Sequence, residues 1–246
     1  MKADPFAQLK LLDVAELDAR IDQLRHQLDA LPEHGRIATL GSALGELTDR
    51  ARDARILVDD LTRAQRKADA DVEQVKARRE RDRSRMDSGQ VSSPKDLERM
   101  SHELGSLERR ISDLEDTELE VMEQLEEAQA ELDRVAAELA DTEQQLAAAT
   151  QERDNRAAAI NAELGTVSAE RSTAAEGLPT DLMSLYERIR GSKSVGAAPL
   201  RARQCGGCRL TLNASDLAVI AKAPSDEVVR CEECSRILVR TSESGL

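Results

Sequence analysis

The sequence predicts a mainly α fold, in which a long antiparallel coiled-coil helical hairpin precedes a small β-rich C-terminal module. Three observations lead to this prediction. Apolar residues repeat at alternating steps of three and four over two long segments, a turn-like stretch separates these segments, and all four cysteines lie within 30 positions of one another. The composition agrees, because 34% of the 246 residues are charged and only Phe6 and Tyr186 are aromatic. Such a chain has a narrow apolar seam rather than a thick core.

The two long segments carry matching heptad seams. The later seam runs from Leu97 to Leu146 and the earlier one from Ile37 to Val75. A seam sustained for about seven heptads is typical of a coiled coil. In an antiparallel pair, the numbers of two facing residues add to a constant. A constant of 179 aligns the two seams and predicts that Val72 faces Leu107.

Two interruptions divide the helical part. Residues 86–94, Met-Asp-Ser-Gly-Gln-Val-Ser-Ser-Pro, predict the turn at which the chain reverses. Ser93 can cap the second helix, and Pro94 suits its first turn because the missing N–H has no intrahelical partner there. Pro32 predicts a kink near residues 32–35. On the N-terminal side of this kink the best alignment constant becomes about 181.

A shift in composition at residues 176–179 predicts the end of the hairpin. We therefore expect two domains, the coiled-coil hairpin of residues 1–178 and a C-terminal part of residues 179–246. In the second, Thr180 can cap a short helix that ends at Arg190, and residues 192–199 are predicted to be a linker. Short strands are expected at residues 210–212, 228–230 and 236–239, with a helical turn at residues 215–221.

Two C-x2-C pairs predict a metal site in the C-terminal part. The candidate ligands are Cys205, Cys208, Cys231 and Cys234. Each pair brings two thiolates to one side of a tight turn, and two such turns complete a tetrahedral site, which thiolate softness and geometry assign mainly to zinc. Thiol–disulfide chemistry and an iron–sulfur cluster are the alternatives. Four protein ligands leave no open position for water, so we expect one structural Zn2+ ion.

With these motifs, the chain resembles the bacterial C4-type zinc-ribbon protein family, whose members join a long N-terminal helical hairpin to a C-terminal ribbon. The resemblance rests on Ser93-Pro94-Lys95-Asp96, Leu114-Glu115-Asp116, Leu185-Tyr186-Glu187-Arg188-Ile189 and the cysteine pairs with Ser235-Arg236-Ile237-Leu238. Ser235 departs from the usual glycine and Val239 from the usual aromatic residue. The resemblance implies an interaction protein, because members are linked to the alternative sigma factor of flagellar genes, to export-apparatus components and to nucleic acid.

The net charge of −13 is unevenly distributed. Residues 1–185 carry a net charge of −16, whereas residues 186–246 carry +3. Six basic residues and no acidic one lie between positions 188 and 209. These are Arg188, Arg190, Lys193, Arg201, Arg203 and Arg209. They are candidate nucleic-acid contacts, because such a stripe can bind several phosphates, and a solvated linker is the alternative interpretation.

The hairpin itself shows a charge gradient. Its turn-proximal end is basic, whereas residues 113–143 carry 13 acidic side chains and only one basic side chain, that of Arg134. This gradient could orient partners or favour self-association from tip to middle. A solvated coiled-coil face is the simpler alternative.

Taken together, these features favour a zinc-binding adaptor or scaffold that docks protein partners in transcription regulation or assembly. The alternative is a nucleic-acid-binding zinc-ribbon protein that uses residues 188–209. We expect no enzymatic activity and no small-molecule substrate, because a chain so poor in aromatic residues is not expected to form a deep site. We also expect a cytoplasmic protein without membrane contact, since no apolar stretch approaches the roughly 20 residues of a membrane span.

Overall fold

The computed structural model describes residues 1–246, which form two compact units. The ribbon unit comprises Met1–His34 and Gln151–Leu246, and the hairpin unit comprises Gly35–Thr150. The ribbon unit therefore combines segments from both sides of the domain boundary expected at residue 178. None of the helices has a segment with the length and hydropathy that crossing a bilayer would require.

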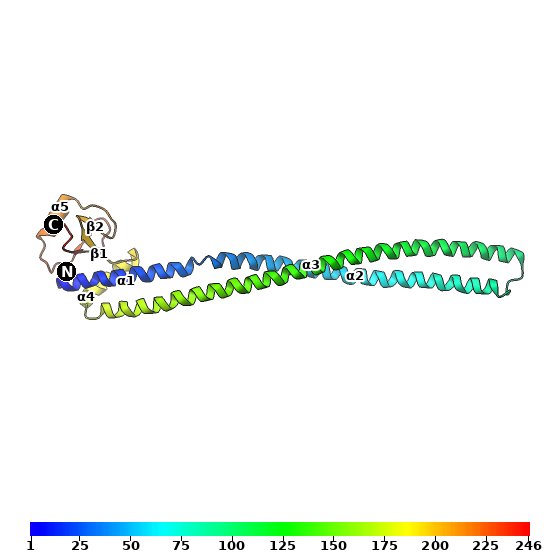
Figure 1. Ribbon diagram of the computed structural model, residues 1–246. Coiled ribbons are helices and arrows are strands. Elements are labelled where there is room, and N and C mark those ends of the chain that lie inside the picture. Colours follow the sequence, from blue (N-terminus) through cyan, green and yellow to red (C-terminus); the bar gives the residue numbers. More distant parts are fainter. The chain divides into compact units, whose positions relative to one another are not determined.

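The hairpin unit confirms the predicted antiparallel helical hairpin. It is built from most of α2 (Glu33–Asp87) and the N-terminal part of α3 (Pro94–Ala175), which run in opposite directions (Figure 1). The chain reverses between Asp87 and Pro94, within the expected turn. Pro94 opens α3, and the backbone N–H groups of Asp96 and Leu97 donate to the carbonyl of Ser93.

The predicted register of this hairpin is wrong. Lys76 Nζ lies 2.8 Å from a carboxylate oxygen of Glu115, yet in the predicted register Lys76 faces position 103, about 18 Å along the helix from Glu115. Arg50 lies 3.1 Å from Glu131 and 3.7 Å from Glu138; the predicted register places it opposite position 129, which fits Glu131 but leaves Glu138 nine residues away. Side chains of this length cannot span such offsets, so the helices must pair differently.

If α3 is shifted by seven residues relative to α2, so that the numbers of facing residues add to 186, these ion pairs are accounted for. In the shifted register Lys76 faces position 110, and Val72, which is 2% exposed, faces Leu114. The same residues occupy the seam in both registers because the seam repeats every seven residues. Heptad periodicity therefore identified the buried faces but could not distinguish two registers that differ by one heptad.

The same correction applies in the ribbon unit, where α1 (Pro5–Asp29) lies against the C-terminal part of α3. Arg171 Nε lies 3.1 Å from Asp18, whereas the expected alignment places Asp18 opposite position 163, about 12 Å along the helix from Arg171. The break at Pro32 is confirmed, because α1 ends at Asp29 and α2 begins at Glu33.

The rest of the ribbon unit is a four-stranded sheet with two short helices. The strands have the spatial order β2-β1-β4-β3; β1 pairs in parallel with β4, and the other pairs are antiparallel. The elements are α4 (Thr180–Lys193), β1 (Ala197–Arg201), β2 (Gln204–Cys205), α5 (Ala214–Lys222), β3 (Val229–Arg230) and β4 (Ile237–Arg240). Outside this sheet the N-terminus forms an isolated bridge, which pairs Lys2 with Glu227, and Ala3 N–H donates to Asp226 O over 2.8 Å.

Three local expectations for this region are wrong. Residues 192–199 are not a linker, because α4 continues to Lys193 and β1 begins at Ala197. Residues 210–212 do not form a strand, since only Thr211 makes a bridge, to Gln204. Thr180 does not cap α4; it is the first helical residue, Pro179 takes the cap position, and no side chain caps the helix.

One apolar cluster joins the sheet to the helices of the ribbon unit. It contains Leu11 and Val14 from α1, Tyr186 from α4, and Ile237 and Val239 from β4, all at most 1% exposed. Val239, which replaces the aromatic residue usual in the family, is therefore a core residue here. Burial of this kind contributes about 1.5–3 kcal/mol per large apolar side chain, so sheet and helices stabilise one another.

The corrected register predicts where an intrachain disulfide can form. Cysteines introduced at Val72 and Leu114 face each other across the seam, so mild oxidation of the full chain should give an intramolecular disulfide, detected as a shift in non-reducing electrophoresis. The matched pair is Val72 with Leu107, which the structure separates by a further seven residues, about 10 Å along the axis. Efficient crosslinking of this second pair and not of the first would contradict the register.

Candidate metal centre and the adjoining polar network

The four cysteines of the ribbon converge on one point. Their sulfur atoms all lie within 4.8 Å of one another; Cys205 and Cys234 Sγ are 3.8 Å apart, and Cys208 and Cys231 Sγ are 3.9 Å apart. A tetrahedral zinc ion with Zn–S bonds of about 2.3 Å requires sulfur separations of about 3.8 Å. The site therefore fits one zinc ion with a complete set of four protein ligands.

Two similar backbone turns present these thiols. Arg209 N–H donates to Cys205 O over 2.7 Å, and Ser235 N–H donates to Cys231 O over 2.8 Å. Both Arg209 and Ser235 have a φ of 63°, a left-handed conformation that favours glycine. The glycine that the resemblance implies after the last cysteine would adopt this conformation readily, and Ser235 adopts it here.

Burial makes the thiols difficult to ionise without a cation. It raises the pKa of Cys205 and raises that of Cys231 to about 12, even though neighbouring backbone N–H groups favour both thiolates. At Cys234 burial also disfavours the charge, but hydrogen bonds from the backbone and side chain of Arg236 and from the other thiols lower its pKa to about 7. A bound cation would stabilise all four thiolates, because its charge offsets the cost of burial.

Arg236 connects the metal site to α4. In addition to its hydrogen bonds with Cys234, it donates from Nη2 to Lys193 O over 2.7 Å and from Nε to Val195 O over 3.0 Å. Lys193 is the last residue of α4 and Val195 lies just after it, so neither carbonyl accepts a hydrogen bond within the helix. Thus the metal site is joined to the helices of the ribbon unit by a charged side chain.

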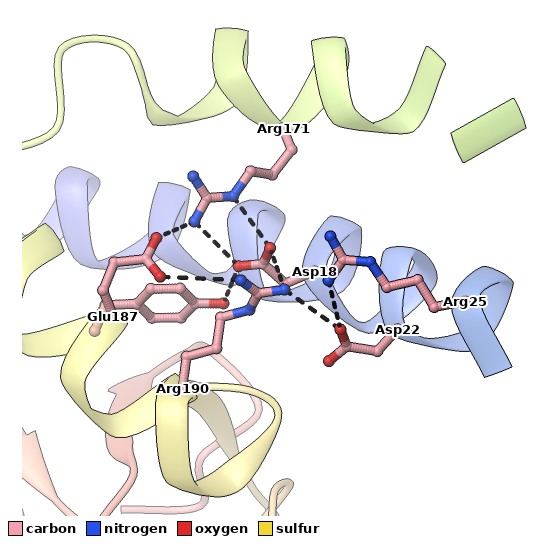
Figure 2. A network of polar contacts seen from close by, with 7 residues as sticks. Asp18, Asp22, Arg25, Arg171, Glu187 and Arg190 are labelled. Atoms are coloured by element: carbon pink, nitrogen blue, oxygen red, sulfur yellow. Dashed lines mark hydrogen bonds and ion pairs between the residues drawn. The ribbon is translucent and has the colours of Figure 1, made fainter. Parts of the chain in front are cut away.

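A second cluster of polar side chains lies among α1, α3 and α4 (Figure 2). Its centre is Asp18, which is 0% exposed. Asp18 accepts hydrogen bonds from Tyr186 Oη at 2.7 Å and from Arg171 Nε at 3.1 Å, and Arg190 Nη2 lies 3.1 Å from it. Because a buried carboxylate is costly unless it is paired and hydrogen-bonded, this site depends on all three donors.

Two further carboxylates extend the network. Glu187 pairs with Arg171 and lies 4.0 Å from Arg190, and Asp22 lies 3.4 Å from Arg190. Burial disfavours the charge of Arg171, but its hydrogen bonds to Asp18 and Glu187 outweigh this effect and raise its pKa. The Tyr186 hydroxyl stays protonated, since burial and then the hydrogen bond to Asp18 raise its pKa well above the usual range.

A glycine allows the sheet to approach this network. A β-carbon on Gly196 would lie 2.4 Å from Tyr186 O and 2.7 Å from its ring. Since such contacts are far below van der Waals distance, any larger residue would push β1 away from α4. The position needs glycine for close approach rather than for an unusual φ.

In the structure, the six basic residues that were proposed to contact nucleic acid have different surroundings. Arg190 is half-buried and belongs to the Asp18 network. Arg201 Nε lies 3.1 Å from Glu243, and Arg203 Nε donates to Gly245 O over 3.0 Å. The remaining three side chains of the stripe are exposed and form no ion pair. These are Arg188, Lys193 and Arg209.

Asp18 should be the most sensitive polar position of the ribbon unit. Asp18→Asn removes the buried carboxylate that pairs with both Arg171 and Arg190, so we expect a loss of about 2–4 kcal/mol in the free energy of unfolding. Tyr186, the only tyrosine, provides a fluorescence signal for denaturant titrations of this unit. The matched control is Asp13→Asn, an exposed aspartate of the same helix, which should change stability by less than about 0.5 kcal/mol. Equal effects of the two substitutions would contradict the role of the network.

Comparison with known proteins agrees with the fold and the site. A model of the CT398-like coiled coil hairpin domain matches residues 14–194, and a model of the C4-type zinc ribbon domain matches residues 204–238. Neither domain description names a class of enzyme.

Proteins from several bacteria are similar over nearly the whole chain. A protein of Mycobacterium tuberculosis is 36% identical, with 98% of each chain covered. A solved structure from Mycobacterium smegmatis has a TM-score of 0.84 at 32% identity and covers 98% of this chain and 100% of that chain. CT398 from Chlamydia trachomatis has a TM-score of 0.68 at 19% identity, covers 96% of this chain and 98% of its own, and supports the fold alone. The chain belongs to the family that joins a CT398-like coiled-coil hairpin domain to a C4-type zinc ribbon domain.

Proposed function

We propose that this zinc-binding protein is a non-enzymatic adaptor or scaffold, which docks protein partners through its ribbon and hairpin units. The observation that carries the proposal is the closed metal site. All four ligands come from the chain, and Cys205, Cys231 and Cys234 are at most 8% exposed. A metal with four thiolate ligands has no open position for a substrate, so its role is to hold a surface in shape.

A groove between α5 and β3 supports docking at the ribbon. It has a volume of about 320 Å3 and is lined by apolar residues, which include Ile220 and Val228, by the acidic residues Asp216, Glu227 and Glu232, and by one basic residue, Arg230. Val219 also lines it and is 67% exposed. Apolar centres with polar rims are typical of protein interfaces. A partner segment with apolar and basic side chains matches this groove best.

Recovery of partners from native cytosol tests this proposal. The intact protein should recover specific proteins after nuclease treatment, and Val219→Glu should reduce their recovery at least fivefold, because it places a charge in the groove. The matched control is Ala218→Glu, which introduces the same residue at an exposed position of α5 outside the groove lining. Equal recovery with both variants would contradict docking at this groove.

Nucleic-acid binding is the second candidate function. Arg188, Lys193 and Arg209 favour it, since they are exposed and have no acidic partner. The same recovery experiment separates the two functions. Nuclease-sensitive recovery that is lost when these three residues are replaced by alanine would favour nucleic acid, because each phosphate contact depends on a basic side chain.

A further inference from the structure

Charge is divided sharply along the hairpin unit. We define its tip as residues 74–112 and its middle as residues 43–73 with 113–143, segments that the corrected register brings together. The tip has 10 basic and 7 acidic residues, a net charge of +3. The middle has 7 basic and 21 acidic residues, a net charge of −14. One chain therefore carries two neighbouring surfaces of opposite sign.

The basic charge of the tip is largely unpaired. Its ion pairs use Lys76, Arg78 and Arg99. Six other basic side chains of the tip are exposed and form no ion pair. These are Arg81, Arg83, Arg85, Lys95, Arg109 and Arg110. They are free to pair with carboxylates of another molecule.

The acidic charge of the middle is equally uncompensated. Glu120, Glu123 and Glu127 are exposed and form no ion pair. Asp69 from α2 lies so close to Glu118 from α3 that a hydrogen bond between the two carboxyls, followed by burial, raises the pKa of Glu118. The raised pKa means that nearby cations, Lys76 among them, do not offset the interaction between the two carboxyls.

The middle also exposes large apolar side chains. Ile56, Leu57 and Leu119 are 53%, 51% and 56% exposed. Docking a partner over a charged surface becomes more favourable when apolar groups are removed from water at the same time. The middle thus carries both components of a protein interface.

The tip is shorter than the middle and can lie wholly against it. The α3 part of the tip, residues 94–112, spans about 28 Å, whereas the α3 part of the middle, residues 113–143, spans about 46 Å. Two hairpin units can lie antiparallel about a two-fold axis near residues 73 and 113, so that each tip covers the other's middle. Measured along the hairpin axis, this arrangement places Arg81 and Arg85 at the level of Glu120, Glu123 and Glu127 of the second copy, while the acidic middles lie apart.

We propose that two copies of the protein associate through their hairpin units, with the basic tip of each copy docked on the acidic middle of the other. Because two-fold symmetry makes both copies use the same surface patch, the association ends at two copies. This proposal is independent of the adaptor function, since it concerns only the chain's own surfaces.

Sedimentation of the zinc-loaded full chain at about 50 mM and about 500 mM salt tests the proposal. Salt screens exposed charges, so the dimer seen at low salt should dissociate with at least a tenfold higher Kd at high salt. The triple substitution Arg81→Glu, Arg83→Glu and Arg85→Glu should abolish the dimer, and so should Glu120→Arg, Glu123→Arg and Glu127→Arg. An equimolar mixture of the two variants should restore a dimer, because the glutamates in the tip of the first variant then meet the arginines in the middle of the second, and the basic tip of the second meets the acidic middle of the first.

The matched control replaces Arg201, Arg203 and Arg209 of the ribbon by glutamate, which changes the net charge by the same amount and should leave the dimer intact. Circular dichroism checks that every variant remains helical. A monomer at low salt would overturn the proposal. So would a dimer that resists salt and both triple substitutions, or a mixture of the two variants that stays monomeric.

Discussion

The convergence of four largely buried thiols on one point is the constraint on which the ribbon unit depends. Without a cation, burial keeps Cys205 and Cys231 protonated, and the short strands around them offer few hydrogen bonds of their own. With a zinc ion, each thiolate gains a ligand bond, and the two turns are fixed relative to each other. Because a zinc ribbon has little core of its own, metal binding supplies much of its folding free energy.

The ordered ribbon in turn covers the helices beside it. Ile237 and Val239 from β4 pack in one cluster with Leu11 and Tyr186, and Arg236 joins the metal site to the end of α4. The Asp18 network holds α1, α3 and α4 together on the other side of Tyr186. Within this unit the metal, the sheet and the helices therefore form one cooperative structure, and the groove beside α5 is presented on a stable base.

Much of this architecture could be predicted from local patterns, and the rest could not for identifiable reasons. The seams, the turn before Pro94 and the cysteine spacing are local signals, whereas the register depends on ion pairs such as Lys76 with Glu115, which a heptad repeat does not encode. Residues 197–199 of β1 were expected in a linker because a parallel strand pair is non-local. Asp18 was missed since its partners lie about 150 or more residues away, although a lone tyrosine beside charged residues at 186–190 was a usable signal. Arg190, a candidate nucleic-acid contact, forms an ion pair with Asp18 instead.

The central claim is that one zinc ion orders both the ribbon and the N-terminal part of α1. Hydrogen exchange of the full chain, measured before and after removal of the metal by a chelator, tests it most directly, with metal analysis of the starting protein. We expect about one zinc ion per chain, and a joint loss of amide protection in β4 and in residues 7–15 while Gly35–Thr150 remains protected, because these segments share the cluster around Tyr186. Full protection of residues 7–15 after metal removal, or iron in place of zinc, would contradict the account.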